Sequence, residues 1–192
     1  MMFQTILSAG LFALFVIMVL VRAAILRKQG IRVIVFGQTD KSDFILVPLV
    51  LAIAYTVLAK LFALPIPNAL IHPFWISIIP GWLGLAICIA ALIGFTFTLV
   101  SFGNSFRVGI DEDKPDKLIT SGMFAFSRNP IYVCFLMFFK GLFLIHCNIV
   151  IAVAVVLFAL AIHRQILREE KFLTKHYGSD YTDYRNKVRR YF

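Results

Sequence analysis

Two polar segments of the sequence carry the residues best suited to chemistry. The first, LITSGMFAFSRNPIY (118–132), contains Arg128 and Asn129, and the second, REEKFLTKHYGSDY, contains the adjacent Glu169 and Glu170. Taken alone, a pair of glutamates is most often a solvated surface. The pair gains interest if the fold brings it beside a guanidinium and the positively charged N-terminus of a helix. The first question is therefore whether the two segments meet.

A nearly unbroken apolar run separates the two segments and is long enough to cross a bilayer and return. We expect one helix over 130–146 and a second over 148–164 that continues past the membrane surface. Asn129 is a favourable N-cap, and Pro130 is favoured at the first helical position. The second helix returns about as far as the first descends. The hairpin therefore predicts that the glutamate pair lies at or just beyond the level of Asn129.

The composition indicates an integral membrane protein with one domain. The chain has 192 residues and is 60% hydrophobic, with a mean hydropathy of +0.88, whereas soluble domains are about 45–50% apolar. The net charge of +9 does not indicate nucleic-acid binding, because the basic residues cluster at the ends of apolar segments. Cys88, Cys134 and Cys147 fall in apolar runs without metal-ligand spacing, so we expect small buried side chains.

The fold class we predict is an all-α integral membrane protein with about five transmembrane helices, a C-terminal helical hairpin and a cytosolic cofactor pocket. The first apolar segment reads as an anchor rather than a removable signal. A short IRVIVF stretch is expected in the interface, and PIPNALIHPFWISIIP as a loop or short helix at the far interface. Residues 1–192 form a single membrane domain, with N-terminal helices in 1–80 and the core in 81–192. The expected spans are 3–26, 44–64, 81–102, 130–146 and 148–164.

The distribution of Lys and Arg predicts the orientation. The connectors after the first and third spans and the C-terminal tail, with their flanks, hold 17 of the 19 basic residues. Basic residues mark the cytosolic side. We therefore expect the N-terminus outside or in the lumen, and the C-terminus in the cytosol. Lys140, within the fourth span, either snorkels to the outer interface or has a buried or substrate-facing role.

The ordered motifs resemble those of the integral-membrane methyltransferases, which include the isoprenylcysteine carboxyl methyltransferases and the phospholipid N-methyltransferases. The resemblance covers 81–190. It rests on Leu118-Ile119-Thr120-Ser121-Gly122, Ser127-Arg128-Asn129-Pro130-Ile131-Tyr132, Glu169-Glu170, and Tyr177-Gly178 with Tyr181 and Tyr184.

The resemblance implies S-adenosylmethionine as the methyl donor, S-adenosylhomocysteine as the product, and a site at the cytosolic membrane edge. Carried over by position, the cofactor-binding residues are Asp111, Lys117, Leu118, Ile119, Phe124, Asn129, Pro130, Ile131, Tyr132 and Glu169. The catalytic group comprises Arg128, Asn129, Tyr132 and Glu170. The residues expected to contact substrate are Arg164, Gln165 and Arg168.

These residue types suit such a cofactor. Its carboxylate fits Arg128 or free N–H groups at a helix start, its ammonium and ribose hydroxyls fit a glutamate, and its adenine fits an aromatic wall such as Phe124. Methyl transfer from a sulfonium is a direct displacement, so the protein mainly aligns the reactants in a dry site. A carboxylate or thiolate acceptor needs no base. An amine must lose a proton, to Glu170, Tyr132 or His176.

The branch within the superfamily stays open. Phe124 stands where the family usually has tyrosine, and Asn129 resembles the phospholipid branch rather than the histidine of the carboxyl branch. The tail with Tyr177 and Tyr184 resembles the carboxyl branch. The leading interpretation is an isoprenylcysteine carboxyl methyltransferase-like enzyme. The alternative is a phosphatidylethanolamine N-methyltransferase.

Two other classes of protein are alternatives: a sterol-reductase-like NADPH oxidoreductase, which usually has more spans, and a non-enzymatic membrane protein. We expect no metal site, because His163 and His176 lack partner spacing. The expected partner is a membrane lipid or lipid-modified substrate that enters sideways from the bilayer, and not a nucleic acid. The oligomeric state is open.

Overall fold

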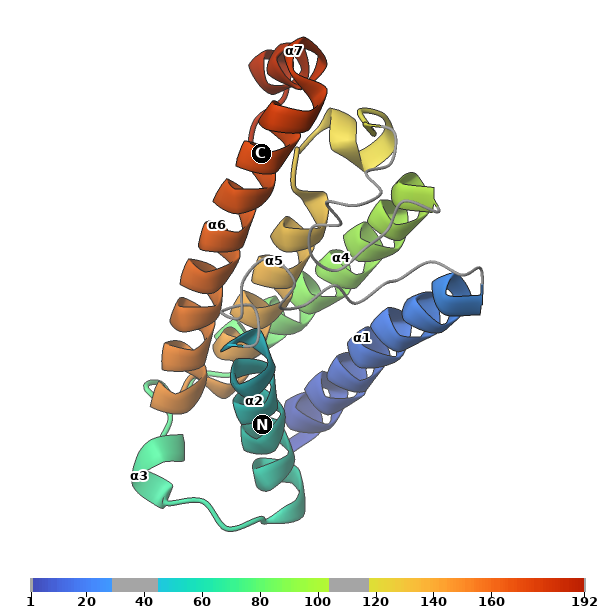
Figure 1. Cartoon of the computed structure of the whole chain (residues 1–192). Helices are drawn as coiled ribbons and strands as arrows, with labels where there is room; N and C mark the ends of the chain where they lie inside the picture. The colour runs from blue at the N-terminus through green and yellow to red at the C-terminus, as the bar shows by residue number, and fades with distance from the viewer. Residues whose placement is uncertain (1, 29–44, 104–117, 192) are drawn as a thin grey trace.

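The computed structural model describes residues 2–28, 45–103 and 118–191, and every regular element within them is helical (Figure 1). This confirms the all-α prediction. Five apolar helices form the bundle: α1 (Met2–Lys28), α2 (Leu46–Phe62), α4 (Ile79–Phe102), α5 (Pro130–His146) and α6 (Ile149–Tyr177). Three short elements connect or extend them: α3 (Asn68–Ile71), the 3-10 helix η3 (Gly122–Ala125) and α7 (Ser179–Lys187). The expected IRVIVF interfacial stretch, Asp111 and Lys117 lie outside the described residues.

Helices α1, α4 and α6 are long and apolar enough to cross a membrane. Helices α2 and α5 have 17 residues each and are about 25 Å long at 1.5 Å per residue, somewhat shorter than a hydrocarbon core of ~30 Å. The bounds predicted for α5 agree with the structure. The second helix of the hairpin continues beyond its apolar segment, as predicted, and ends at Tyr177.

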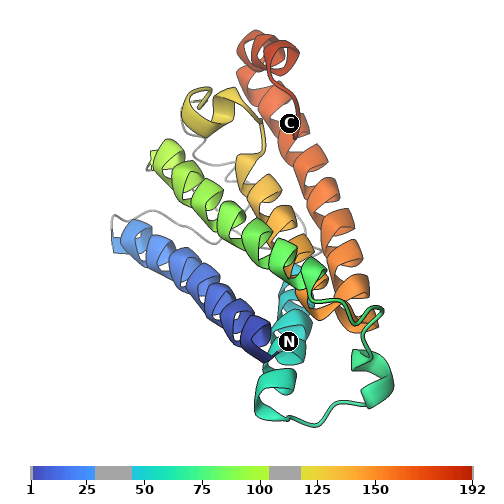
Figure 2. The same ribbon diagram turned by 180° about the vertical axis from the view of Figure 1, so that it is seen from behind.

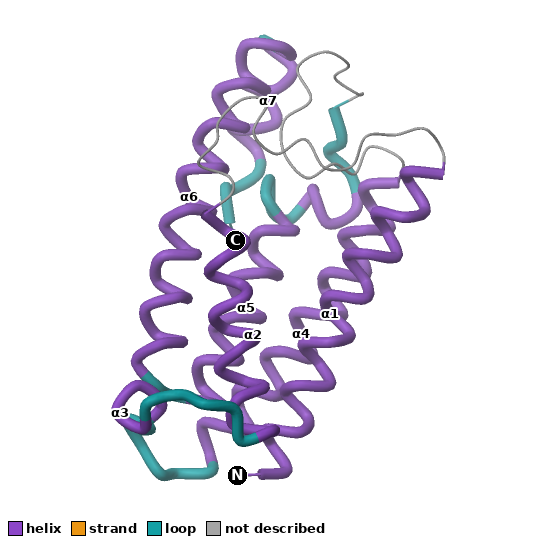
Figure 3. The backbone as a smooth tube through the Cα atoms, turned by 60° about the horizontal axis from the view of Figure 1, so that its bottom comes forward, coloured by secondary structure: helices purple, strands orange, loops and turns teal. Residues whose placement is uncertain are grey.

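The helices alternate in direction, so the bundle has two distinct ends (Figures 1 and 2). The N-terminus and α3 lie at one end, whereas α7 lies at the other, which we call the polar end. Helix α5 begins and α6 finishes at the polar end, and Figure 3 shows the two helices running alongside each other. The hairpin turn at the opposite end is fixed by Asn148, whose side-chain oxygen accepts a hydrogen bond from the Ile151 N–H at 3.0 Å.

Aromatic side chains fill the centre of the bundle. Phe15 of α1 stacks on Phe138 of α5, with ring centroids 4.8 Å apart, and meets Phe135 edge-on at 5.1 Å. Phe95 of α4 and Phe158 of α6 join the same buried cluster. Aromatic pairs in these geometries add to the stabilisation that burial alone supplies. The cluster ties α1 to the α4–α6 core.

Buried polar contacts hold α1 at the end opposite the polar end. The amide of Gln4 donates to the carbonyl of Ile78 at 3.1 Å, and Ser8 Oγ lies 2.9 Å from His146 Nε2. Hydrogen bonds between transmembrane helices satisfy groups that have no water available. Lys140, in contrast, is exposed on the surface of α5. This contradicts a buried role for Lys140 and is compatible with snorkelling, whereas a substrate-facing role stays a prediction.

Helices α4 and α5 approach most closely at two glycines. A Cβ added to Gly84 would lie 2.5 Å from the carbonyl oxygen of Gly141, and a Cβ on Gly141 would lie 2.7 Å from the carbonyl oxygen of Gly84. Small residues permit such backbone contact between membrane helices. Because α5 begins at the candidate site, this contact also sets the position of that site relative to α4.

The variant Gly141→Ala is expected to destabilise the bundle by about 1–3 kcal/mol, because the added methyl group has no space and must separate α4 from α5. The measurement is thermal unfolding in detergent. Gly10→Ala is the matched control: it is also a helical glycine in an apolar helix, and a Cβ there meets nothing within 4 Å. Equal melting temperatures for the two variants would contradict the packing argument.

Candidate functional site

The two polar segments meet at the polar end of the bundle. Asn129 Nδ2 lies 3.5 Å from Glu170 Oε1, although the residues are 41 positions apart. The Tyr132 hydroxyl donates to Glu169 Oε1 across 37 positions. The hairpin therefore brings both glutamates level with the start of α5, as predicted from the lengths of its two helices.

Asn129 uses its side chain in a way the sequence did not indicate. We predicted an N-cap, but the amide makes no capping hydrogen bond to α5. It donates instead to the Arg190 carbonyl at 3.1 Å and toward Glu170. The backbone N–H of Asn129 is bound by Ser127 Oγ at 3.1 Å, so the short side chain of Ser127 shapes the turn before Pro130. The N-cap position of Asn129 and the first helical position of Pro130 agree with the prediction, but the side chain of Asn129 does not supply the capping hydrogen bond. Its amide group instead binds acceptors in distant parts of the chain.

Glu170 is the centre of a buried ion cluster. Its side chain is only 9% exposed and lies 3.0 Å from Arg128 Nη2 and 2.8 Å from Arg190 Nη2. Arg190 Nε also donates to both carboxylate oxygens, at 3.1 and 3.2 Å. A buried carboxylate needs such compensation, because an unpaired charge removed from water is strongly destabilising. Both oxygens of Glu170 are thus engaged by guanidinium groups, and Arg128 is engaged in turn.

Glu169 lies in a different, less enclosed environment. It accepts hydrogen bonds from the Tyr132 hydroxyl and from Gln165 Nε2, the latter at 2.9 Å. Arg168 donates to Gln165 Oε1. Two of the expected substrate residues, Gln165 and Arg168, therefore adjoin Glu169. The third, Arg164, is exposed on α6.

The chain after α7 contributes contacts that sequence reasoning missed. The carbonyls of Arg189 and Arg190 accept hydrogen bonds from the Arg128 N–H at 3.0 Å and from Ser127 Oγ at 3.2 Å. The hydrogen bond to Glu170 is the main cause that raises the pKa of the Arg190 guanidinium. The sequence showed only a basic C-terminal tail, which is typical of a cytosolic membrane flank. No pattern in the sequence distinguished Arg190 from the other basic residues of this tail.

Phe124 packs within a second cluster beside the site. It is 7% exposed, meets Phe102 edge-on at 4.6 Å, and packs with Tyr181 and Tyr184 of α7. The Tyr184 hydroxyl donates to the Phe124 carbonyl at 2.6 Å. Leu118 and Ile119 pack against the same cluster. Thus Leu118, Ile119 and Phe124 form a group apart from Asn129, Tyr132 and Glu169.

The tyrosines of α7 are buried and neutral. Burial, followed by the charge of Glu170, raises the pKa of Tyr181 to about 12. Burial also raises the pKa of Tyr184 above its usual range. Among the described residues, the Tyr181 hydroxyl has no hydrogen-bond partner, although its side chain is 1% exposed. This hydroxyl is a buried donor near the Glu170 cluster that remains available.

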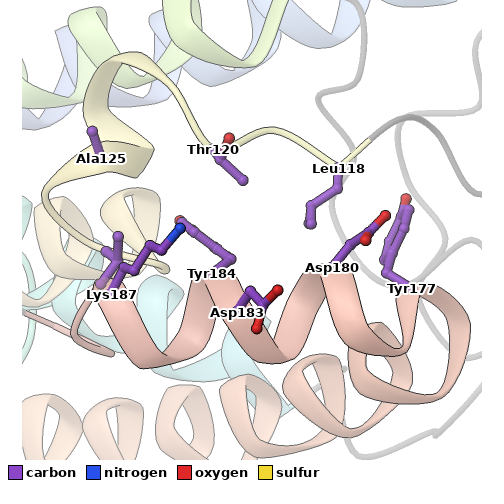
Figure 4. Close-up of a pocket in the computed structure, with 9 residues that line it drawn as sticks. Leu118, Thr120, Ala125, Tyr177, Asp180, Asp183, Tyr184 and Lys187 are labelled. Carbon is purple, nitrogen blue, oxygen red and sulfur yellow. The ribbon is translucent and has the colours of Figure 1, made fainter.

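A cavity of about 720 Å³ lies between the segment that leads into η3 and α7 (Figure 4). Its size falls within the range of roughly 300–1,000 Å³ that small-molecule sites occupy. Asp180 and Asp183 supply carboxylates, and among the described residues Leu118 is the one predicted cofactor residue in its wall. The lining residues are Leu118, Thr120, Ala125, Tyr177, Asp180, Asp183, Tyr184, Lys187 and Val188.

The predicted site residues therefore divide into three groups. Arg128, Asn129 and Glu170 form the ion cluster. Tyr132 and Glu169 adjoin it, with Gln165 and Arg168 alongside, while Pro130 and Ile131 form the first turn of α5. The cofactor residues predicted from 118 to 124 lie with α7.

Comparison with known proteins identifies the family to which the chain belongs. The chain matches the family model described as phospholipid methyltransferase over residues 74–180, more than half of its length. A search of the curated proteins gives no match. The matched range contains α4, the α5–α6 hairpin, Asn129, Glu169 and Glu170. The chain therefore belongs to the phospholipid methyltransferase family, within the integral-membrane methyltransferases.

Proposed function

We propose that this protein transfers a methyl group from S-adenosylmethionine to a lipophilic acceptor at the cytosolic face of a membrane. The observation that supports it most directly is the meeting of Asn129, Tyr132, Glu169 and Glu170 at one end of a membrane hairpin, in a member of a methyltransferase family. An NADPH oxidoreductase and a non-enzymatic membrane protein are not favoured by that family membership.

The residues around Glu169 fit parts of this cofactor. Glu169 is a partly exposed carboxylate, which suits an ammonium or ribose hydroxyls. The first turn of α5 has backbone N–H groups without helical partners, and its dipole favours a carboxylate there. When bound, the cofactor supplies a methyl group on a positively charged sulfur. The protein's own residues bind and orient the reactants and exclude water from the reacting atoms.

The cytosolic assignment rests on the charges of the described helices. The polar end carries Arg27 and Lys28 of α1, Arg128, and the basic residues of α6, α7 and the tail. The end with the N-terminus and α3 has no Lys or Arg in its described loop between α2 and α4. Basic residues accumulate on the cytosolic side of membranes. The proposed site thus faces the cytosol, while the acceptor's hydrocarbon chain remains in the bilayer.

For the acceptor we propose the carboxylate of an isoprenylcysteine as the leading candidate. Both oxygens of Glu170 are held by guanidinium groups, so this residue is poorly placed to take a proton. A carboxylate acceptor requires no base. The second candidate is the amine of a phospholipid, which the family description favours. In that case Glu169, with Tyr132 beside it, is the residue best placed to receive the proton.

The variants Glu169→Gln and Asn129→Ala are expected to weaken S-adenosylhomocysteine binding by about tenfold or more. Glu169→Gln replaces a charged acceptor by a neutral one, and Asn129→Ala removes the hydrogen bonds to Glu170 and to the Arg190 carbonyl. Calorimetric titration of the purified protein in detergent measures the change, and thermal unfolding checks that each variant is folded. Asp183→Asn, in the cavity beside α7, is the matched carboxylate-to-amide control and should bind normally. Loss of binding in Asp183→Asn alone would place the cofactor in that cavity instead.

The acceptor is identified by incubating membranes that contain the protein with methyl-labelled S-adenosylmethionine. With a prenylated cysteine supplied, the label is expected in a base-labile methyl ester, because a carboxylate acceptor yields an ester. Phosphatidylethanolamine-containing membranes without prenylcysteine are the comparison. Label in a base-stable phospholipid headgroup would make the amine the acceptor. Label in neither lipid, with a water-soluble product instead, would contradict a lipid acceptor.

A further inference from the structure

The segment after α7 runs back along α6 toward the start of α5. Helix α7 stops at Lys187, where Val188 adopts an extended conformation and its N–H binds the Tyr184 carbonyl at 3.0 Å. Figure 1 shows the C-terminal end of the chain beside the upper part of α6, below α7. We call residues 188–191 the clasp.

The clasp is tied to both helices of the hairpin. Its carbonyl groups bind the turn that precedes α5: the Arg189 carbonyl accepts from the Arg128 N–H at 3.0 Å, and the Arg190 carbonyl accepts from Asn129 Nδ2 at 3.1 Å. On the α6 side, the hydroxyl of Tyr191 lies 2.6 Å from His163 Nδ1. Backbone and side-chain contacts thus connect the clasp to the turn before α5 and to α6.

Arg190 makes the strongest contacts of the clasp. Its Nε and Nη2 atoms bind the Glu170 carboxylate in the parallel, two-bond geometry that fixes a carboxylate in orientation as well as position. Its own side chain remains 35% exposed, so it reaches the cluster from the solvent side.

Neutralisation of Glu170 does not by itself require Arg190. Arg128 already pairs with the same carboxylate at 3.0 Å, and its side chain is 8% exposed. What Arg190 adds is geometry. Its guanidinium fixes the plane of the Glu170 carboxylate, and its carbonyl fixes the amide of Asn129. The amide and the carboxylate together set the first turn of α5, next to Tyr132 and Glu169.

We propose that Arg190 is a positioning residue for methyl transfer, which acts through Glu170 and Asn129 to hold the start of α5 in the orientation that binds the cofactor. The proposal rests on the function proposed above. Arg190 belongs to the C-terminal segment, which lies outside the matched range of 74–180. The proposal therefore gives this segment a role in positioning the site residues.

The test compares Arg190→Gln, Arg190→Lys and Arg189→Gln in the full-length protein in detergent. Arg190→Gln is expected to weaken S-adenosylhomocysteine binding about tenfold, because it removes two charge-assisted hydrogen bonds. Arg190→Lys should fall between this variant and the wild type, since an ammonium lacks the planar fork. Arg189→Gln makes the same charge change in an exposed neighbouring side chain, keeps the backbone carbonyl, and should bind like the wild type.

Steady-state kinetics separate positioning from mere stabilisation. Positioning predicts that KM for S-adenosylmethionine rises in Arg190→Gln by about the same factor as the dissociation constant, with a smaller change in kcat. A purely structural role predicts a lower melting temperature and less active protein, with KM unchanged. That result would overturn the proposal. If Arg190→Gln does not fold, wild-type affinity in Arg190→Lys would overturn it equally.

The wild-type titration distinguishes a failure of the positioning role of Arg190 from a failure of the proposed function. A wild-type protein that binds S-adenosylhomocysteine, together with an Arg190→Gln variant of equal affinity, removes the positioning role and leaves the proposed function intact. If the folded wild-type protein does not bind S-adenosylhomocysteine, the proposed function is contradicted. The positioning role of Arg190, which rests on that function, is then contradicted as well.

Discussion

The structure of the polar end depends on one buried carboxylate. Glu170 of α6 lies where the start of α5 and the chain after α7 converge, and both of those segments supply donors to it. Breaking one partner of such a buried pair is costly, because the charge left behind cannot reach water. The ion pairs and hydrogen bonds that offset the burial of the Glu170 charge therefore also hold α6, the start of α5 and the chain after α7 together, although these segments are distant in sequence.

The bilayer explains why this convergence occurs at a fixed depth. In hydrocarbon every backbone polar group must be satisfied within its own helix, so the apolar segments of α5 and α6 can lie there only as complete helices. The close contact at Gly84 and Gly141 then sets the separation of α5 from α4, and the Phe15 aromatic cluster holds α1 against them. Packing in the apolar middle thus decides where the polar groups meet at its edge.

Sequence patterns predicted the helices and the meeting of the two polar segments, because apolar length and helix rise fix where a hairpin returns. They did not predict the side-chain roles. Asn129 stands at the N-cap position of α5 as expected, but the acceptors of its side-chain amide, Glu170 and the Arg190 carbonyl, lie 41 and 61 residues away. Arg190 itself was hidden among basic residues that any cytosolic tail carries. Phe124, expected as a wall for adenine, is buried against α7, a contact that no local pattern encodes.

The adjacent glutamates illustrate how one motif divides into two roles. Successive residues of a helix point about 100° apart, so Glu169 and Glu170 cannot share one set of neighbours. Glu170 faces the guanidinium groups and is closed off, whereas Glu169 faces Tyr132 and Gln165 and stays partly exposed. A carboxylate already held by two arginines builds the site, and its less enclosed neighbour is the one able to exchange partners with a ligand. Under the function proposed above, the Glu-Glu motif divides into Glu170, which holds the start of α5 and the C-terminal segment together, and Glu169, the glutamate proposed to bind the ligand.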